Sequence, residues 1–350
     1  MKKTLAIILS AAIALLGLTA CDGSNEQEEQ TPPYPVTADN VTIEKRPKAV
    51  ASLSPALTKI LLDLGYQNRI VGYPEEDTIP DPLPEPESTS SEEPAWWKFW
   101  VEESSTPVSD PAPSEVEHIG TALEPDLPAV GKVKPEIIFT AVPFTKAQMD
   151  KLTQVKIKVV VMPAVTSVEE LKNRYLEIVK IMDGQLEADL TGVAITDEIQ
   201  GQLDYIQSKV PAERKSFLYV TSSDPLFATK DTLEGALLCL IGENLAGDAA
   251  EYTIDSKALA ELDPDVIFYS APMTAESFTS SELFKNKRAV TEGNLIEIDH
   301  ASLLLQTREI SDSLRAAAKL LYPDVDFTAP APAQPVGSGT DSSAAESTAE

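Results

Sequence analysis

Short apolar runs that do not alternate with polar residues recur along the chain, and they are typical of strands buried on both faces of a parallel sheet. They lie at 50–53, 69–73, 136–142 and 159–162, and again at 216–220, 266–269 and 295–298. Between these runs, apolar positions at helical spacing predict helices over 55–64, 146–155, 232–245 and 310–321. Strands that alternate with helices in this way predict an α/β fold with mostly parallel sheets.

The pattern divides the chain into two α/β units, at 46–184 and 211–326, and leaves a stretch of helical period over 185–210 between them. Gly192 and Gly201 lie inside this stretch, and each costs a helix about 1 kcal/mol relative to alanine. A helix kept despite that cost must be held by packing. We therefore expect two Rossmann-like lobes bridged by a single long α-helix.

One motif occurs in both units. Residues 127–139 and 258–268 each read as a short helix, a proline followed by an acidic residue, and a buried strand. The proline and the acid favour a sharp turn from helix to strand. The two copies start at residues 127 and 258, about 130 residues apart, and they support a pair of related lobes.

The start of the chain has the layout of a secretion signal. Two lysines precede an apolar run over 5–18, and small residues then lead to Cys21. This order resembles the lipobox of bacterial lipoproteins. The resemblance implies a signal peptide over 1–20, a diacylglycerol on Cys21, and a mature protein held on the extracellular or periplasmic side of the cell membrane.

Composition adds three segments to this picture. The formal net charge of −28 argues against binding to nucleic acid. Polar and acidic residues over 21–45 predict a flexible tether, and the small and polar residues of 327–350 predict a disordered tail. An acidic insertion rich in proline and serine covers 75–117, inside the first lobe.

All three tryptophans lie within that insertion, at Trp96, Trp97 and Trp100. So many aromatic rings in an otherwise polar loop call for burial. They could stack on a flat ligand as a lid, pack the insertion onto its own lobe as a staple, or insert at a lipid surface, which the surrounding acids would oppose. We favour the staple slightly and keep these residues as ligand candidates.

The chain resembles the periplasmic-binding family for iron-siderophore, haem and vitamin B12 uptake. The resembling segments occur in family order, at 51–55, 68–72, 134–138, 157–160, 242–244, 263–267 and 289–293. The resemblance implies two lobes joined by a long helix, with a metal chelate (ferric siderophore, haem or cobalamin) held between them. It also implies delivery to an ABC permease and its ATPase, by a protein that is not an enzyme and has no cofactor of its own. We expect a monomer.

The resemblance also implies a docking surface, and here the sequence departs from the family. In the vitamin B12 branch each lobe offers the permease a glutamate, but the matching positions hold Pro128 and Lys257. The nearby carboxylates could substitute for those glutamates, and they are Glu124, Asp126, Glu251 and Asp255. If they do not, the alternative is a surface lipoprotein that acts as a scavenger, sensor or interaction module.

Several single residues are candidates for ligand contact. His300 follows a strand at a position that faces the ligand in the family, with a polar loop residue as the equal alternative. Arg308 could meet an anion, although a salt bridge is slightly favoured. The aromatic candidates near strand ends are Tyr73, Phe227 and Tyr269, each of which could equally belong to the core.

Enzyme chemistry and a bare metal site both lack support in the sequence. We find no glycine-rich phosphate loop, no nucleophile elbow and no sensibly placed cysteine–histidine pair. His118 is expected in a surface loop, and two histidines on different lobes cannot make the site that a bare zinc or manganese ion needs. We therefore predict no catalytic residues and no metal ligands.

Overall fold

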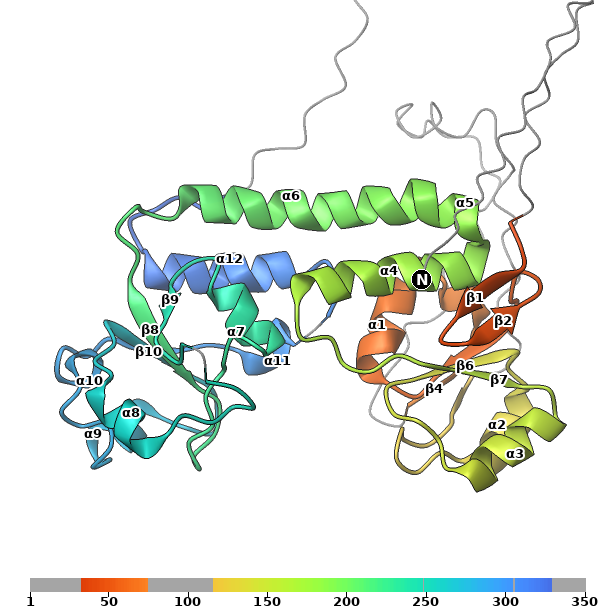
Figure 1. Cartoon of the computed structure of the whole chain (residues 1–350), viewed down its shortest axis with the longest axis horizontal. Coiled ribbons are helices and arrows are strands. Elements are labelled where there is room, and N and C mark those ends of the chain that lie inside the picture. Colours follow the sequence, from red (N-terminus) through yellow and green to blue (C-terminus); the bar gives the residue numbers. More distant parts are fainter. Residues whose placement is uncertain (1–32, 75–115, 248, 305, 329–350) are drawn as a thin grey trace, which may run out of the picture. The chain divides into compact units, whose positions relative to one another are not determined.

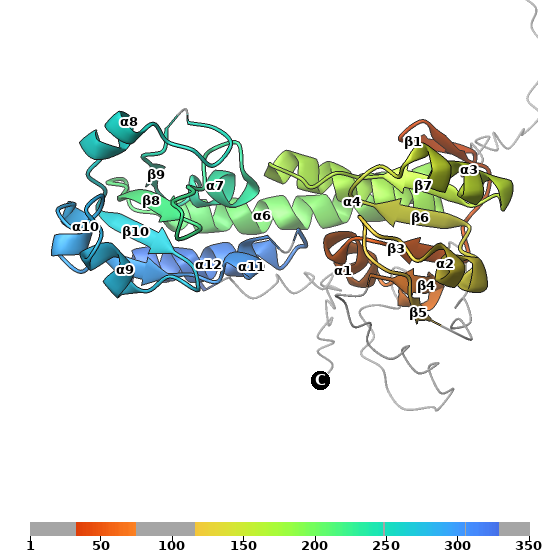
Figure 2. The ribbon, with the colours of Figure 1, turned by 90° about the horizontal axis from the view of Figure 1, so that it is seen from below.

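The computed structural model describes residues 33–74, 116–247, 249–304 and 306–328 (Figure 1). The first lobe, called the N lobe, is built on a five-stranded sheet in the order β5-β4-β3-β6-β7, with every pair parallel. Figure 2 shows the strands in this order. Their bounds are Val50–Ser52 for β3, Ile70–Tyr73 for β4, Glu117–His118 for β5, Ile137–Thr140 for β6 and Lys158–Val161 for β7. Helices α1 (Pro55–Asp63), α2 (Leu127–Val133) and α3 (Lys146–Gln154) connect them.

The second lobe, called the C lobe, has a four-stranded parallel sheet in the order β11-β10-β8-β9. Its strands are β8 (Ser216–Val220), β9 (Glu243–Asn244), β10 (Val266–Tyr269) and β11 (Leu295–Glu297). Its helices are α7 (Leu233–Leu238), α8 (Ser256–Glu261), α9 (Ala275–Thr279), α10 (Arg288–Thr291), α11 (His300–Leu303) and α12 (Ile310–Leu321). The predicted α/β class, with parallel sheets in both units, is confirmed.

Helical backbone continues without a break from Gln185 to Lys209, as α5 (Gln185–Glu187), a π-helical segment (Ala188–Gly192) and α6 (Val193–Lys209). Helix α4 (Val168–Asp183) precedes it. Helix α6 packs against both α4 and α12, and α6 and α12 run side by side in Figures 1 and 2. Packing on a helix of each lobe explains how the bridge tolerates its two glycines.

Four of our segment boundaries are wrong. Residues 36–43 lie in the predicted tether but form a hairpin, β1 (Val36–Ala38) paired with β2 (Val41–Ile43), because Val36 and Ile43 are buried. The helix expected over 232–245 ends at Leu238, and β9 follows. The predicted tail begins too early, because Phe327 is buried against Tyr322. Glu117, at the end of the predicted insertion, belongs to β5.

The repeated motif appears as α2–β6 in the N lobe and α8–β10 in the C lobe. Asp126 caps α2 by accepting a hydrogen bond from the Ala129 amide at 3.0 Å. Asp255 caps α8 by accepting from the Lys257 and Ala258 amides at 2.9 and 3.3 Å. The two lobes therefore start the same helix with the same kind of cap.

A single cluster of buried apolar residues extends from the N-lobe hairpin and α1 through α4 and α6 into β8 and α12. Separate clusters lie under the remaining faces of the two sheets. Among the described helices, none is both long enough and apolar enough to cross a membrane.

Candidate functional site

In open parallel sheets, ligands bind beyond the carboxyl ends of the strands. In the N lobe, this edge carries a tyrosine and a histidine side by side. Tyr73 ends β4 and His118 ends β5, and the two residues are partners in the parallel ladder. Their ring centroids lie 4.3 Å apart. The backbone of β5 therefore places His118 beside a predicted ligand residue rather than in the isolated surface loop that we expected.

A backbone carbonyl group also orients the His118 ring. Its Nδ1 lies 3.2 Å from the carbonyl oxygen of Pro74. A neutral imidazole that donates Nδ1–H to this carbonyl keeps the Nε2 lone pair for a metal or a hydrogen-bond donor. The His118 side chain is exposed, and Tyr73 is half-buried. This pair can therefore present an imidazole nitrogen and a phenol to one ligand.

The C lobe has a second such pair at the carboxyl edge of its sheet. The hydroxyl of Tyr219, in β8, lies 2.7 Å from Nδ1 of His300, at the start of α11. The two rings meet edge to face with centroids 5.7 Å apart. Burial raises the pKa of Tyr219, so this phenol stays protonated and can donate to Nδ1. His300, predicted to contact the ligand, thus lies at the expected edge and is half-buried. Tyr219 is 0% exposed, so it supports His300 from the core and does not itself face a ligand.

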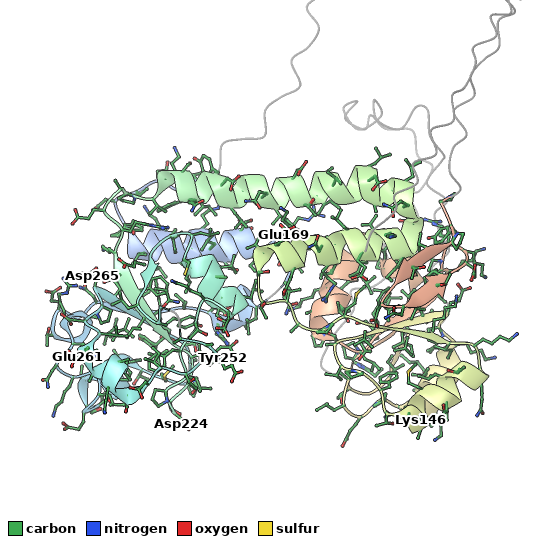
Figure 3. All side chains as sticks on the ribbon, viewed as in Figure 1. Lys146, Glu169, Asp224, Tyr252, Glu261 and Asp265 are labelled. Atoms are coloured by element: carbon green, nitrogen blue, oxygen red, sulfur yellow. The ribbon has the colours of Figure 1, made fainter. Side chains whose placement is uncertain are left out.

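A buried carboxylate lies near this second pair. Glu234 is 0% exposed, and its carboxylate lies beside the hydroxyl of Tyr252. Burial and the neighbouring Glu234 carboxylate raise the pKa of Tyr252 to about 12. Figure 3 shows Tyr252 in the C lobe, with Asp224 on a neighbouring loop. Glu234 was not among our candidates, because its burial near this pair depends on packing that the sequence pattern did not indicate.

Two of the aromatic candidates are core residues. Phe227 is 1% exposed and packs near Phe284. Tyr269 is 7% exposed, with its ring centroid 5.3 Å from that of Phe278. Both residues lie near strand ends as expected, but their side chains turn into the C-lobe core.

Arg308 makes the salt bridge that we favoured over an anion contact. Its Nε donates to the Asp63 carboxylate at 2.9 Å, and its Nη1 lies 3.2 Å from Glu198. The Arg308 amide also donates to the hydroxyl of Tyr175 at 2.9 Å. The guanidinium is therefore engaged by side chains of α1 and α6.

The four proposed docking carboxylates are all exposed, and so are Pro128 and Lys257. In Asp126 and Asp255, Oδ1 of each carboxylate accepts the capping bonds. Cys21 and the three tryptophans lie outside the described residues. Within the described ranges, no group of three or more histidines, cysteines and carboxylates could hold a metal ion.

Comparison with known proteins places this geometry in a family. The family model for periplasmic binding proteins matches residues 50–301. The chain is 23% identical over 342 residues to YvrC of Bacillus subtilis (strain 168), an uncharacterized ABC transporter substrate-binding lipoprotein, and the match covers 93% of this chain and 99% of YvrC.

Two solved structures share the fold. One is a possible iron-binding periplasmic protein from Staphylococcus epidermidis, with a TM-score of 0.59, 19% identity, and coverage of 79% of this chain and 100% of that one. The other is the haem-binding protein HutB of Vibrio cholerae, with a TM-score of 0.59, 15% identity, and coverage of 79% and 99%. The chain thus belongs to the periplasmic binding protein family, and it is a binding protein rather than an enzyme.

Proposed function

We propose that the chain is the substrate-binding lipoprotein of an ABC importer, and that it captures a metal chelate and delivers it to the permease and its ATPase. The family match and the relative YvrC support this class of function. The observation that carries the ligand class is the pair of Tyr73 and His118 at the carboxyl edge of the N-lobe sheet.

Among ferric siderophores, haem and corrinoids, the pair of Tyr73 and His118 favours a metal-centred macrocycle. Phenolate and imidazole groups are ligands of haem iron, and aromatic rings offer flat apolar contact to a macrocycle. Structures with this fold include haem-binding proteins from Vibrio cholerae and Roseiflexus sp. RS-1 and a vitamin B12 binding protein from Vibrio cholerae. Tyr73 and His118 are the residues that we assign to the metal-facing side of the N lobe.

The charge of the strand ends favours a chelate of low net charge. Among the described residues, the first three after each parallel strand include no lysine or arginine. Arg308 is held by Asp63 and Glu198, and Glu234 adds a buried carboxylate to the C-lobe edge. An anion brought to these edges would lose its hydration without a basic partner, which disfavours highly anionic ferric siderophores.

Thermal-shift titration tests the ligand class. Lipid-free protein from Asp22 onward would be titrated with haem, cobalamin, cobinamide, and neutral and anionic ferric siderophores. A ligand at 100 times its Kd should stabilise the fold by about 2.7 kcal/mol, and we expect this saturable rise with a macrocycle. A shift with anionic siderophores alone would contradict the ligand class, and no shift with any compound would contradict capture.

We also propose that Cys21 carries the diacylglycerol and holds the protein, as a monomer, on the outer face of the cell membrane. The name of YvrC as a lipoprotein supports this placement. A membrane tether raises the local concentration of the binding protein at its permease. Replacement of Cys21 by alanine should release the protein from the membrane fraction.

The exposed Pro128 and Lys257 favour one alternative, a scavenger or sensor that no longer docks on a permease. The two functions differ in one measurable property. A transport protein should stimulate the ATPase of a partner permease when it carries its ligand, and an interaction module should not.

A further inference from the structure

The N lobe contains a hollow of about 670 Å³ at the edge opposite the tyrosine–histidine pair. It lies where β6 and β7 begin and where α2 and α3 end, and its lining includes Ile43, Ile137 and Ile157. Tyr73 and His118 lie where parallel strands of the same sheet end. The hollow is therefore separate from the proposed chelate site, and its volume falls in the range of small-molecule sites.

The hollow combines an apolar surface with a basic rim. Val155 lines the hollow and is 61% exposed, and the three isoleucines and two prolines of the lining are buried behind this surface. Four lysines line the same space, in a chain whose formal net charge is −28. They are Lys45, Lys134, Lys156 and Lys158. Two glutamates share the lining, which leaves an excess of positive charge there.

Only two of these ammonium groups are engaged by described residues. Lys45 lies 3.3 Å from the Glu136 carboxylate, and Lys158 donates to the Thr42 carbonyl. Lys134 and Lys156 make no hydrogen bond or ion pair with any residue that the structure describes, and both are exposed. Their ammonium groups are thus available to an anionic group that enters the hollow.

The backbone gives a second, independent reason to single out these two lysines. Lys134 has φ +49° and Lys156 has φ +61°, in the left-handed region where glycine is the usual residue after a helix. Each follows a helix end, of α2 and α3 respectively. A lysine in this conformation costs conformational free energy that glycine would avoid. Both turns nevertheless have a lysine, and both lysines line the same hollow.

We propose that this hollow binds a single-chain amphiphilic carboxylate of the fatty-acid type. The carboxylate meets Lys134 and Lys156 in charge-assisted hydrogen bonds, and the hydrocarbon chain packs against the exposed side chain of Val155. A concave site of this size can enclose a single amphiphile molecule. The surface of a lipid bilayer would instead contact a flat or convex face of a protein. The site is independent of the chelate, so both ligands can be bound at once.

The test uses laurate as the probe, and calorimetry measures its binding to the lipid-free protein from Asp22 onward. We expect saturable binding of one laurate per chain. The double variant Lys134→Gly/Lys156→Gly should weaken this binding at least about tenfold, a loss equivalent to about 1.4 kcal/mol. Since glycine relieves both left-handed turns, the variant should melt no earlier than the wild type.

Matched controls separate charge at the hollow from charge in general. The variant Lys146→Gln/Lys151→Gln removes two exposed lysines from α3 of the same lobe and should leave laurate affinity unchanged. Dodecanol, which lacks the carboxylate, should bind weakly and equally to the wild type and the glycine variant. Unchanged laurate affinity in the glycine variant, acetate binding as tight as laurate, or binding to anionic vesicles without monomer binding would each overturn the proposal.

Discussion

The Asp183 carboxylate joins three parts of the N lobe at the end of α4. It accepts hydrogen bonds from Arg69 at 2.7 Å, from Arg46 at 2.8 Å and from Tyr66 at 2.7 Å. Burial alone would raise the pKa of Asp183, but the Arg69 guanidinium and the other donors hold it below its usual value. The ionised form of this acid therefore stabilises the fold.

This lowered pKa predicts an acid-sensitive contribution to stability. The contribution is complete above the unfolded pKa of about 3.9, and it is lost as the pH falls through the lower, folded-state pKa. At pH 7, Asp183→Asn should lower the free energy of unfolding by about 3 kcal/mol, since it leaves Arg69 buried without its anion. Urea unfolding of both proteins should show that the gap narrows below about pH 4.

The exposed pair Lys146–Asp150, with N and O atoms 3.8 Å apart, provides the control. Asp150→Asn should change the free energy of unfolding by less than about 0.5 kcal/mol at any pH, because solvent screens the pair. A gap for Asp183→Asn that stays constant from pH 7 to pH 3 would contradict the proposed role of its ionisation.

The proposed chelate site makes a prediction that distinguishes surface aromatics from core aromatics. Tyr73→Phe and His118→Ala should each weaken chelate binding at least about tenfold, because each removes a polar atom from the N-lobe edge. Tyr269→Phe should leave affinity unchanged, since Tyr269 is packed against Phe278 in the core. Isothermal titration with the ligand found by thermal shift gives the three affinities, and equal losses in all three variants would count against the assignment.

Sequence could locate these positions but not the directions of their side chains. Tyr73 and Tyr269 both end buried strands, and only the packing of the C lobe turns Tyr269 inward. His118 illustrates the opposite case. Its strand has two residues and no apolar pattern of its own, so only pairing with β4 across a long insertion reveals its place beside Tyr73.

At the scale of the element, apolar runs predicted the strands well, whereas apolar positions at helical spacing predicted the ends of the helices less well. The last helix was predicted over 310–321, and the structure has the same bounds. The helix expected over 232–245 instead stops at Leu238, because the following residues must reach the edge of the sheet, where the Glu243 amide bonds to the Lys215 carbonyl. Helical period continues through this segment, so a long-range contact ends the helix.

Two glycines in helices make opposite predictions. A Cβ on Gly235, in α7, would lie 1.9 Å from the Thr229 carbonyl oxygen, whereas a Cβ on Gly201, in α6, meets nothing within 4 Å. Gly235→Ala should therefore destabilise the protein by about 1–3 kcal/mol through overpacking. Gly201→Ala should stabilise it by up to about 1 kcal/mol through helix propensity. Urea unfolding measures both, and equal effects of the same sign would contradict this account.

The capping acids of α2 and α8 make a test of docking possible without loss of the helices. Asparagine caps a helix about as well as aspartate, so Asp126→Asn/Asp255→Asn removes two charges and keeps both caps. We expect unchanged chelate affinity and at least about tenfold weaker stimulation of the partner ATPase. Exposed Glu261→Gln in α8 serves as the control, and full stimulation by the double variant would shift docking to Glu124 and Glu251 or favour the non-transport alternative.

At the scale of the whole molecule, the chain contains two α/β lobes, which are joined by a helix and by contacts between distant residues. The bridge from Gln185 to Lys209 was predicted from its helical period, but its π-helical segment was not. Sequence also gave no sign that Arg308 would reach Asp63, which is 245 residues away along the chain. Such ties depend on three-dimensional packing, which a local pattern does not contain.

These ties predict how the protein unfolds. The apolar cluster that extends through α4, α6 and α12 belongs to both lobes. Arg308, just before α12, pairs with Asp63 of α1 and donates its amide to the Tyr175 hydroxyl of α4. Neither lobe can therefore expose its share of this cluster without cost to the other, and calorimetry should show a single cooperative transition. Asp63→Asn should lower the melting temperature but keep that single transition, since the cluster remains. Two separated transitions in the wild type would mean that the lobes unfold independently and that the shared cluster contributes little to their coupling.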